Sequence, residues 1–213
     1  MRPTKPAAKQ KMDLPRLYIE NHEQCSEWLL LEYRHCLDTW ENLAFTNVQD
    51  LALRSALSVL IKRMVEAEGP GECRAGVFSS GLAELKEFRA GETIVLDPEA
   101  PKQLRTADFP KFKALVIGGI LGSEGFSGKT GRLLTGKLGC EARNLGKIQL
   151  SIDSAGVVCK LILLGMKLEE IELTRELEIC RNDGSSTVLP YGYPLLDGKV
   201  IFTPGLREYL EKH

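Results

Sequence analysis

A glycine-rich stretch at residues 118–134, GGILGSEGFSGKTGRLL, has the residue types that bind phosphate groups or a flat cofactor. It follows an apolar run and contains Gly-Lys-Thr, as does the phosphate-binding loop of nucleotide hydrolases. That loop requires four residues between its first glycine and Gly-Lys, but Ser123 stands at the required position and Gly122 lies one residue too far away. The spacing disfavours a triphosphate site. Paired glycines after a strand still let a ligand approach the backbone closely, so they predict another kind of ligand site.

A second glycine-bearing loop lies within RNLGKIQLSIDSAGVV, residues 143–158. The pattern predicts a strand end, a Leu-Gly turn, a polar segment and then a helix, for which Asp153 or Ser154 is the expected N-cap. In open α/β sheets, ligands bind at the carboxyl ends of the strands. The two loops therefore predict a cofactor site with backbone hydrogen-bonding groups and apolar walls.

The elements that must position these loops alternate along the chain. Hydrophobic patterns predict strands at residues 16–20, 42–48, 75–80, 92–97, 113–119, 140–146, 170–179 and 187–192. They predict helices at residues 25–40, 50–67, 82–88, 128–138, 153–166 and 204–213. This alternation predicts an α/β fold with a mostly parallel sheet and helices on both faces. We expect one domain over residues 16–213, with a strand-rich extension from about residue 170.

Composition excludes several classes of function. The chain has 213 residues and a net charge of −1, so no basic field covers the surface and large-scale wrapping of nucleic acid is not expected. Residues 1–15 are basic and are expected to be disordered. We find no membrane-length apolar run and no signal peptide. The six cysteines form no CxxC pair and the three histidines match no zinc spacing, which predicts a cytosolic or nuclear protein with reduced thiols and no metal site. Of the two locations we expect the cytoplasm.

Five motifs occur in order from about residue 17 to the C-terminus. They are YIENHEQCSEWLLLEY at 18–33, LDP at 96–98, IGGILG at 117–122, RNLGKIQLSIDSA at 143–155 and LPYGYPLLDGK at 189–199. Together they resemble the SPOUT class of S-adenosylmethionine (SAM) methyltransferases. The resemblance is closest to its protein-arginine methyltransferase-like branch, which is also described as a family of SAM-dependent RNA methyltransferases. The resemblance implies a deep trefoil knot in the C-terminal part of the sheet, although true knots are rare.

The resemblance also implies a SAM pocket made by the loops of the knot, with S-adenosylhomocysteine (SAH) as the product. Carried over to this chain, the expected cofactor-binding residues are Leu96, Asp97, Pro98, Gly118, Gly119, Ile120, Leu121, Gly122, Leu145, Gly146, Gln149, Leu150, Ser151 and Ala155. Each has a plainer alternative. The glycines could form only a turn, the leucines could be ordinary core, and Ser151 and Asp153 could serve only to cap a helix.

If the methyl acceptor is arginine, its site should be acidic. A guanidinium holds its proton tightly, and a carboxylate can orient it and accept the proton that is lost. We expect Glu20 and Asp153 to be catalytic, because both terminate segments near the predicted pocket, and Glu27 is a third candidate. Glu27 could equally be a solvated residue near a helix N-terminus. Glu32 borders the apolar face of its helix, where a buried structural hydrogen bond is favoured over catalysis.

Three functions remain open from the sequence. The first is methylation of an arginine on a protein, with a ribosomal protein as the substrate class suggested by the resemblance, by a monomer or weak homodimer. The second is methylation of RNA, since basic residues gather in sequence near the predicted loops: Lys111, Lys113, Lys129, Arg132, Lys137, Arg143 and Lys147. The third is a nucleotide-binding or non-catalytic module.

Overall fold

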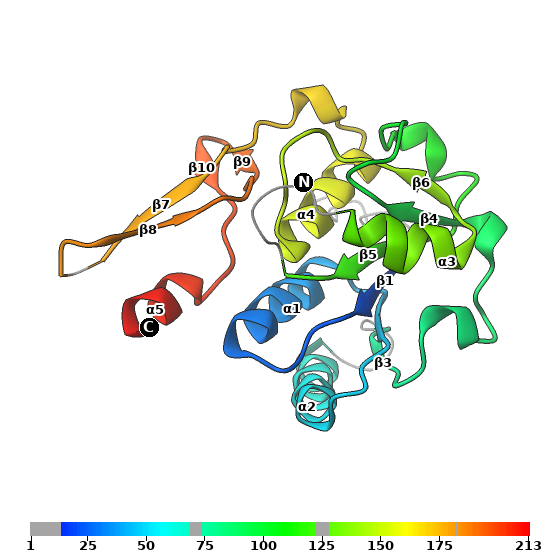
Figure 1. The fold of residues 1–213 in the computed structure, drawn as a ribbon, viewed down its shortest axis with the longest axis horizontal. Coiled ribbons are helices and arrows are strands. Elements are labelled where there is room, and N and C mark those ends of the chain that lie inside the picture. The colour runs from blue at the N-terminus through cyan, green and yellow to red at the C-terminus, as the bar shows by residue number, and fades with distance from the viewer. Residues whose placement is uncertain (1–13, 69–73, 122–127, 182) are drawn as a thin grey trace, which may run out of the picture.

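A sheet of six parallel strands forms the centre of the protein (Figure 1). The computed structural model describes residues 14–68, 74–121, 128–181 and 183–213. The strands are β1 (Arg16–Asn21), β2 (Leu43–Thr46), β3 (Gly76–Val77), β4 (Thr93–Leu96), β5 (Ala114–Gly119) and β6 (Glu141–Arg143). Their order is β3-β2-β1-β5-β4-β6, and β1 pairs with β5 along its whole length, from Arg16 opposite Ala114 to Asn21 opposite Gly119. The predicted parallel sheet is confirmed.

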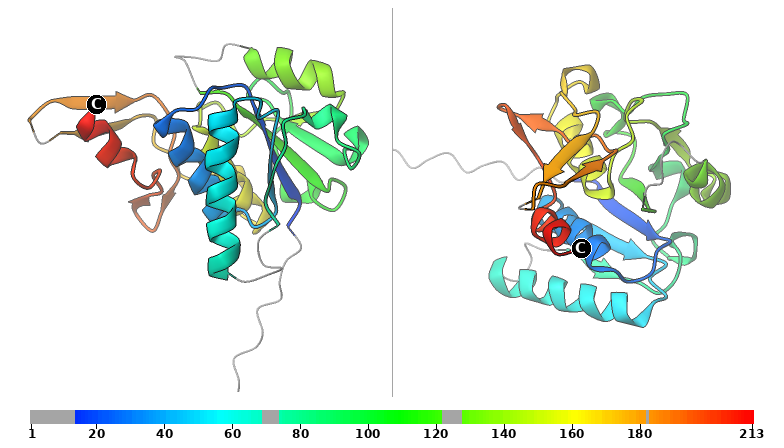
Figure 2. Two further views of the ribbon diagram at one scale, coloured as in Figure 1. Left: turned by 90° about the horizontal axis from the view of Figure 1, so that it is seen from below. Right: turned by 60° about the vertical axis from the view of Figure 1, so that its left-hand side comes forward.

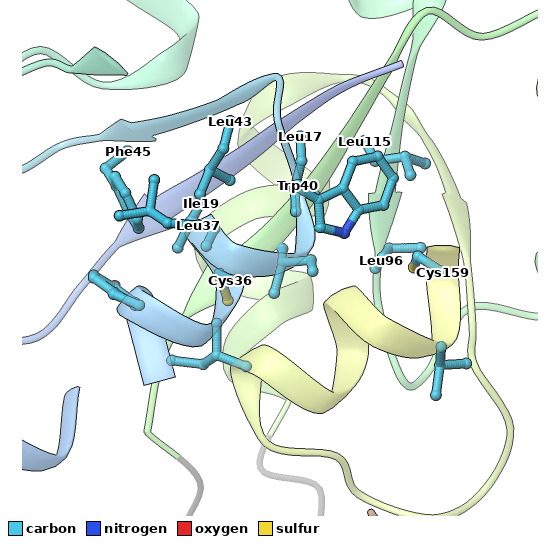
Figure 3. Close-up of a cluster of buried hydrophobic side chains, with 14 of the residues drawn as sticks. Leu17, Ile19, Cys36, Leu37, Trp40, Leu43, Phe45, Leu96, Leu115 and Cys159 are labelled. Carbon is cyan, nitrogen blue, oxygen red and sulfur yellow. The ribbon is translucent and has the colours of Figure 1, made fainter. Parts of the chain in front are cut away.

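Both faces of the sheet are covered, because its strands carry apolar side chains on alternate sides. One face packs against α1 (Glu27–Thr39), α2 (Leu51–Glu68) and α4 (Ile152–Leu163), and it forms the larger core. The other face packs mainly against a π-helix, Gly131–Thr135, which is continued by the short α3 (Gly136–Leu138). Figure 3 shows Trp40 in the larger core with Leu17, Leu43 and Leu115, which come from three neighbouring strands.

Helix α1 places its apolar stripe against the sheet as the spacing predicts. Ser26 caps its N-terminus by accepting a hydrogen bond from the Leu29 backbone, and the helix ends before Trp40, which is extended. Leu29, Tyr33 and Trp40 are fully buried. The indole of Trp40 donates to the carbonyl of Gly156 at 3.0 Å, which ties the end of α1 to α4.

The C-terminal residues form an extension that packs against the outer side of α1 (Figures 1 and 2). It contains the antiparallel pair β7 (Leu177–Cys180) and β8 (Ser186–Leu189), the small pair β9 (Leu195–Leu196) and β10 (Lys199–Val200), and α5 (Leu206–Lys212). A separate apolar cluster within it, centred on Tyr193 and Leu206, includes Trp28 and Leu31 of α1. The organisation into one domain stays a prediction.

Several expected elements were wrong in extent. The strands predicted at 75–80 and 140–146 are only Gly76–Val77 and Glu141–Arg143. The helix predicted at 82–88 is only a 3-10 turn, Leu82–Glu84, because so short a segment gains too little from helix formation. The strand predicted at 170–179 begins only at Leu177. Its first half bends away, since Leu173 bridges to Pro194 and the Thr174 backbone N–H donates to the Tyr193 carbonyl.

The start of α4 also differs from expectation. Its cap is Ser151 rather than Asp153 or Ser154, and the Ser151 hydroxyl accepts a hydrogen bond from the Ser154 backbone. The helix predicted at 128–138 runs from Lys129 to Leu138, but its middle part, Gly131–Thr135, is a π-helix. Residues 1–13 of the predicted tail lie outside the described residues. The trefoil knot stays a prediction. Within the described ranges we find no helix able to cross a membrane and no cluster of metal ligands.

Candidate cofactor pocket and active site

A pocket lies at the carboxyl ends of β5, β4 and β6, the three adjacent strands whose loops form it. Most of the residues expected to bind the cofactor line this pocket: Leu96, Asp97, Pro98, Gly118, Ile120, Leu121, Leu145, Gly146, Gln149, Leu150, Ser151 and Ala155. The parallel sheet brings them together, because the carboxyl ends of parallel strands share one edge.

Gly119 is not among the residues that line the pocket. A side chain on it would point to the opposite side, where its Cβ would lie 2.2 Å from the Tyr33 hydroxyl and 3.0 Å from the Cα of Asn21. Successive residues of a strand face opposite sides, so Gly118 and Gly119 cannot both face the same side. The residue at 119 is therefore glycine because β5 packs closely against α1. Gly122 lies outside the described residues.

The pocket also contains residues that the sequence did not single out as cofactor ligands: Glu99, Ile117, Gly128, Lys129, Thr130, Ile148 and Ile152. Gly128 to Thr130 belong to the Gly-Lys-Thr run, which the sequence suggests only as a phosphate motif. The other four residues are sequence neighbours of predicted pocket residues in the same loops or strands. Their position in the sequence was the one signal that could have identified them.

Asp97 fixes the geometry of the pocket. Its side chain is almost fully buried and accepts hydrogen bonds from the Glu99 backbone at 3.0 Å and the Thr135 hydroxyl at 2.7 Å. The bond from Thr135 joins the loop after β4 to the π-helix, and the bond from Glu99 fixes the loop itself. Irregular π-helical turns are frequent at functional sites. Asp97 therefore has at least a structural role, because it holds the loop after β4 against the π-helix.

None of the three carboxylates predicted to be catalytic lines the pocket. Glu20 is buried, with its carboxylate hydrogen-bonded to the Thr46 hydroxyl and, at 3.0 Å, to the Leu82 backbone. Glu27 has a side chain that is 62% exposed, and His213 lies 3.9 Å from it. Its position fits the solvated alternative for a residue in the first turn of α1. Catalytic roles for both stay predictions.

Asp153 lies directly behind the pocket wall. Its carboxylate accepts hydrogen bonds from the Ser151 hydroxyl at 2.6 Å and the Thr203 hydroxyl at 2.6 Å, and it lies 2.7 Å from Nδ1 of His35. Ser151 itself lines the pocket. The network joins α4, α1 and the C-terminal extension, three segments that are far apart in the sequence.

Glu32 is a second buried carboxylate at this junction. It accepts hydrogen bonds from the Trp28 indole at 2.6 Å and from the Ile152 backbone at 3.0 Å. Burial and, to a smaller extent, the negative charge of Asp153 raise the pKa of Glu32 to about 8. These contacts agree with the structural hydrogen bond expected from the sequence, and they also attach α1 to the pocket wall.

Several basic residues near the loops are paired with acids. Lys113 lies 2.6 Å from Glu92, and Arg143 lies 2.9 Å from Asp108. Lys111 forms an ion pair with Glu141. These three cations of the sequence cluster are thus partly neutralised, which weakens the argument for an RNA-binding surface there.

The geometry agrees with comparisons to known proteins. A family model described as "Protein arginine N-methyltransferase SFM1-like" matches residues 16–213. The chain belongs to this family. It is 27% identical over 202 residues to protein arginine N-methyltransferase SFM1 of Saccharomyces cerevisiae, covering 92% of this chain and 94% of the yeast protein.

Solved structures show the same fold. The crystal structure of yeast SFM1 complexed with SAH is similar with a TM-score of 0.77 and 26% identity, over 92% of this chain and 94% of the yeast chain. The crystal structure of dual-specific Trm10 from Thermococcus kodakaraensis is similar in fold, with a TM-score of 0.52 and 21% identity over 73% of this chain and 96% of that one. The SPOUT fold expected from the motifs is therefore confirmed.

Proposed function

We propose that this protein is a SAM-dependent methyltransferase that modifies an arginine side chain of a protein substrate. The observation that carries the proposal is the pocket built by the loops after β4, β5 and β6, in a chain of the SFM1-like family. The SAH complex of yeast SFM1 supports the choice of cofactor.

The pocket residues fit SAM chemically. SAM supplies a methyl group on a sulfonium, which passes to a nitrogen nucleophile with loss of one proton and leaves SAH. Ile117, Leu145 and Ile152 provide apolar walls suited to an adenine ring. Lys129 and Glu99 offer opposite charges to the carboxylate and ammonium of the amino-acid part. The backbone at Gly118 and Gly146 can approach a ligand closely.

Asp153 is the best placed of the carboxylates predicted to be catalytic. Through Ser151 it is the one in hydrogen-bond contact with a residue of the pocket lining. We propose that, from this position, the negative charge of Asp153 attracts the acceptor guanidinium and that its carboxylate accepts the proton lost from the acceptor nitrogen. We further propose a ribosomal protein as the substrate class, a cytoplasmic location, and action as a monomer or weak homodimer.

The cofactor can be tested by thermal unfolding. SAM or SAH at a hundred times its Kd should stabilise the fold by about 2.7 kcal/mol, whereas ATP with magnesium should leave the melting temperature unchanged. The reaction can be tested by incubating the protein with methyl-labelled SAM and a cell extract. We expect the label in protease-sensitive material and, after hydrolysis, in methylarginine. Label confined to nuclease-sensitive material would contradict the proposal.

A further inference from the structure

Two carboxylates and one hydroxyl are buried together behind the wall of the cofactor pocket. Glu32 of α1 is 2% exposed, Asp153 of α4 is 1% exposed, and Tyr193 of the C-terminal extension is 0% exposed. The Tyr193 hydroxyl lies near Ser151 and both carboxylates, yet within the described residues it has no hydrogen-bond partner of normal geometry. Buried hydroxyls usually have a regular partner, so this one can take up a further hydrogen bond from a group that enters the cluster.

The cluster lacks a permanent cation. In the described part of the chain, the ion pair to these carboxylates is that of Asp153 with His35, which is charged only when protonated. The other titratable groups that face the two carboxylates are tyrosines and a cysteine, which never carry a positive charge. They are Tyr33 and Cys36 on α1, and Tyr191 and Tyr193 on the extension. Two buried carboxylates without a fixed cation are unfavourable, and one responds by staying protonated.

A guanidinium group has the shape and charge that the cluster lacks. It is a planar cation with five N–H donors, so it can bond to two carboxylates and a hydroxyl oxygen at once. A lysine ammonium is a point charge that matches such an arrangement less well. The two partly exposed aromatic residues beside the cluster are Trp28, which already contacts Glu32, and Tyr191. Aromatic rings stack favourably on guanidinium planes.

We propose that Glu32, Asp153 and Tyr193 form the site that receives the guanidinium of the substrate arginine, with Trp28 and Tyr191 flanking its entrance. This inference rests on the proposed function. The site adjoins the cofactor pocket through Ser151, which lines that pocket and bonds to Asp153. Because Tyr193 and Thr203 come from the extension, the C-terminal residues complete the arginine site.

Tyr193→Phe is the sharpest test, because the hydroxyl it removes has no hydrogen-bond partner of normal geometry among the described residues. We expect an unchanged or higher melting temperature and an unchanged Kd for SAH. We expect the apparent KM for acceptor protein in the labelled-SAM assay to rise about tenfold or more, as for loss of a hydrogen bond to a charged group. Tyr209→Phe is the matched control, since Tyr209 packs in the same apolar cluster and edge-on to Trp28. It should leave KM unchanged.

A direct binding measurement separates this inference from the proposed function. In nuclear magnetic resonance titrations of the SAH-loaded protein, Nα-acetyl-L-arginine methylamide should shift the Trp28 indole signal, and the lysine analogue should not. Tyr193→Phe should weaken that binding. An unchanged KM and unchanged binding in the Tyr193→Phe protein would overturn the inference, while label in methylarginine would still support the function. Absence of methylarginine with the wild-type protein would instead overturn the function.

Discussion

Gly119 allows β5 and α1 to pack closely, because it has a hydrogen atom in place of a side chain. Gly119→Ala should lower the free energy of unfolding by about 1–3 kcal/mol, because its Cβ would collide with the Tyr33 hydroxyl. It would also strain the bond from that hydroxyl to Asn21. Urea unfolding measures the change. Gly91→Ala is the control, since a Cβ there meets no atom within 4 Å. An unchanged unfolding midpoint for Gly119→Ala would show that β5 and α1 can move apart freely.

The buried Glu32 should make stability depend on pH. Its pKa rises from 4.5 in the unfolded chain to about 8 in the folded protein. Between these values the folded state holds a proton that the unfolded state has lost. The stabilisation is thus complete below about pH 4.5 and disappears as the pH rises through 8.

Urea unfolding at several pH values tests this linkage. Across the window, the free energy of unfolding should fall with rising pH by up to about 1.4 kcal/mol per pH unit from this group. Glu32→Gln should flatten that part of the slope. The slope of the free energy against pH is the quantity to compare, rather than its absolute value. The NH2 group of the new amide would face an N–H donor of Trp28 or Ile152, which lowers stability equally at every pH. An identical slope in both proteins would count against a proton held by Glu32.

At the residue scale, the sequence predicted the pocket better than the acidic cluster. The pocket loops are local: strand pattern, Gly or Pro, and helix start lie within a few residues of one another. Asp153, by contrast, bonds to His35, 118 residues earlier, and to Thr203, 50 residues later. No local pattern in the sequence predicts that these three residues lie together. Which of Gly118 and Gly119 faces the ligand also depends on strand register, which the glycines alone do not reveal.

At the scale of elements, the contact between α1 and α4 should carry much of the stability. Trp40→Phe removes the indole hydrogen bond to the Gly156 carbonyl, which keeps only its bond within α4, and it also shrinks a fully buried ring. We expect a loss of about 1–3 kcal/mol in the free energy of unfolding, measured in urea. Gly156→Ala keeps the hydrogen bond, and its Cβ would lie at an ordinary contact distance of 3.4 Å from the indole, so it should change stability by less than about 1 kcal/mol. Equal effects of the two variants would contradict this account.

The elements themselves were predictable where burial dominated. The long stripe of α1 and the apolar strands β4 and β5 follow directly from hydrophobic spacing. The predictions failed where tertiary contacts redirected the chain. Leu173 and Thr174 have a strand-like pattern, but they pair with residues 193–194 instead of continuing into β7.

At the scale of the whole molecule, the two tryptophans report on different cores. Trp40 lies in the large core beside the sheet, and Trp28 contacts the cluster of the C-terminal extension. In the Trp28→Phe protein, fluorescence therefore follows the sheet core; in the Trp40→Phe protein, it follows the extension. If residues 16–213 unfold as one domain, each fluorescence curve should coincide with the far-ultraviolet circular dichroism of the same variant. An earlier transition of Trp28 fluorescence would mean that the extension unfolds separately.

The pairing of the first strand with the fifth determines when the protein can fold during its synthesis. Arg16 of β1 pairs with Ala114 of β5, 98 positions later, and β1 is an interior strand of the sheet. At about 5–20 residues per second, β1 leaves the ribosome roughly 5–20 seconds before this partner also leaves it. One side of an apolar strand stays open for that interval, and long-range parallel pairing is intrinsically slow. A nascent chain arrested before residue 114 should therefore associate with chaperones that bind exposed strands, and release should begin once β5 has emerged.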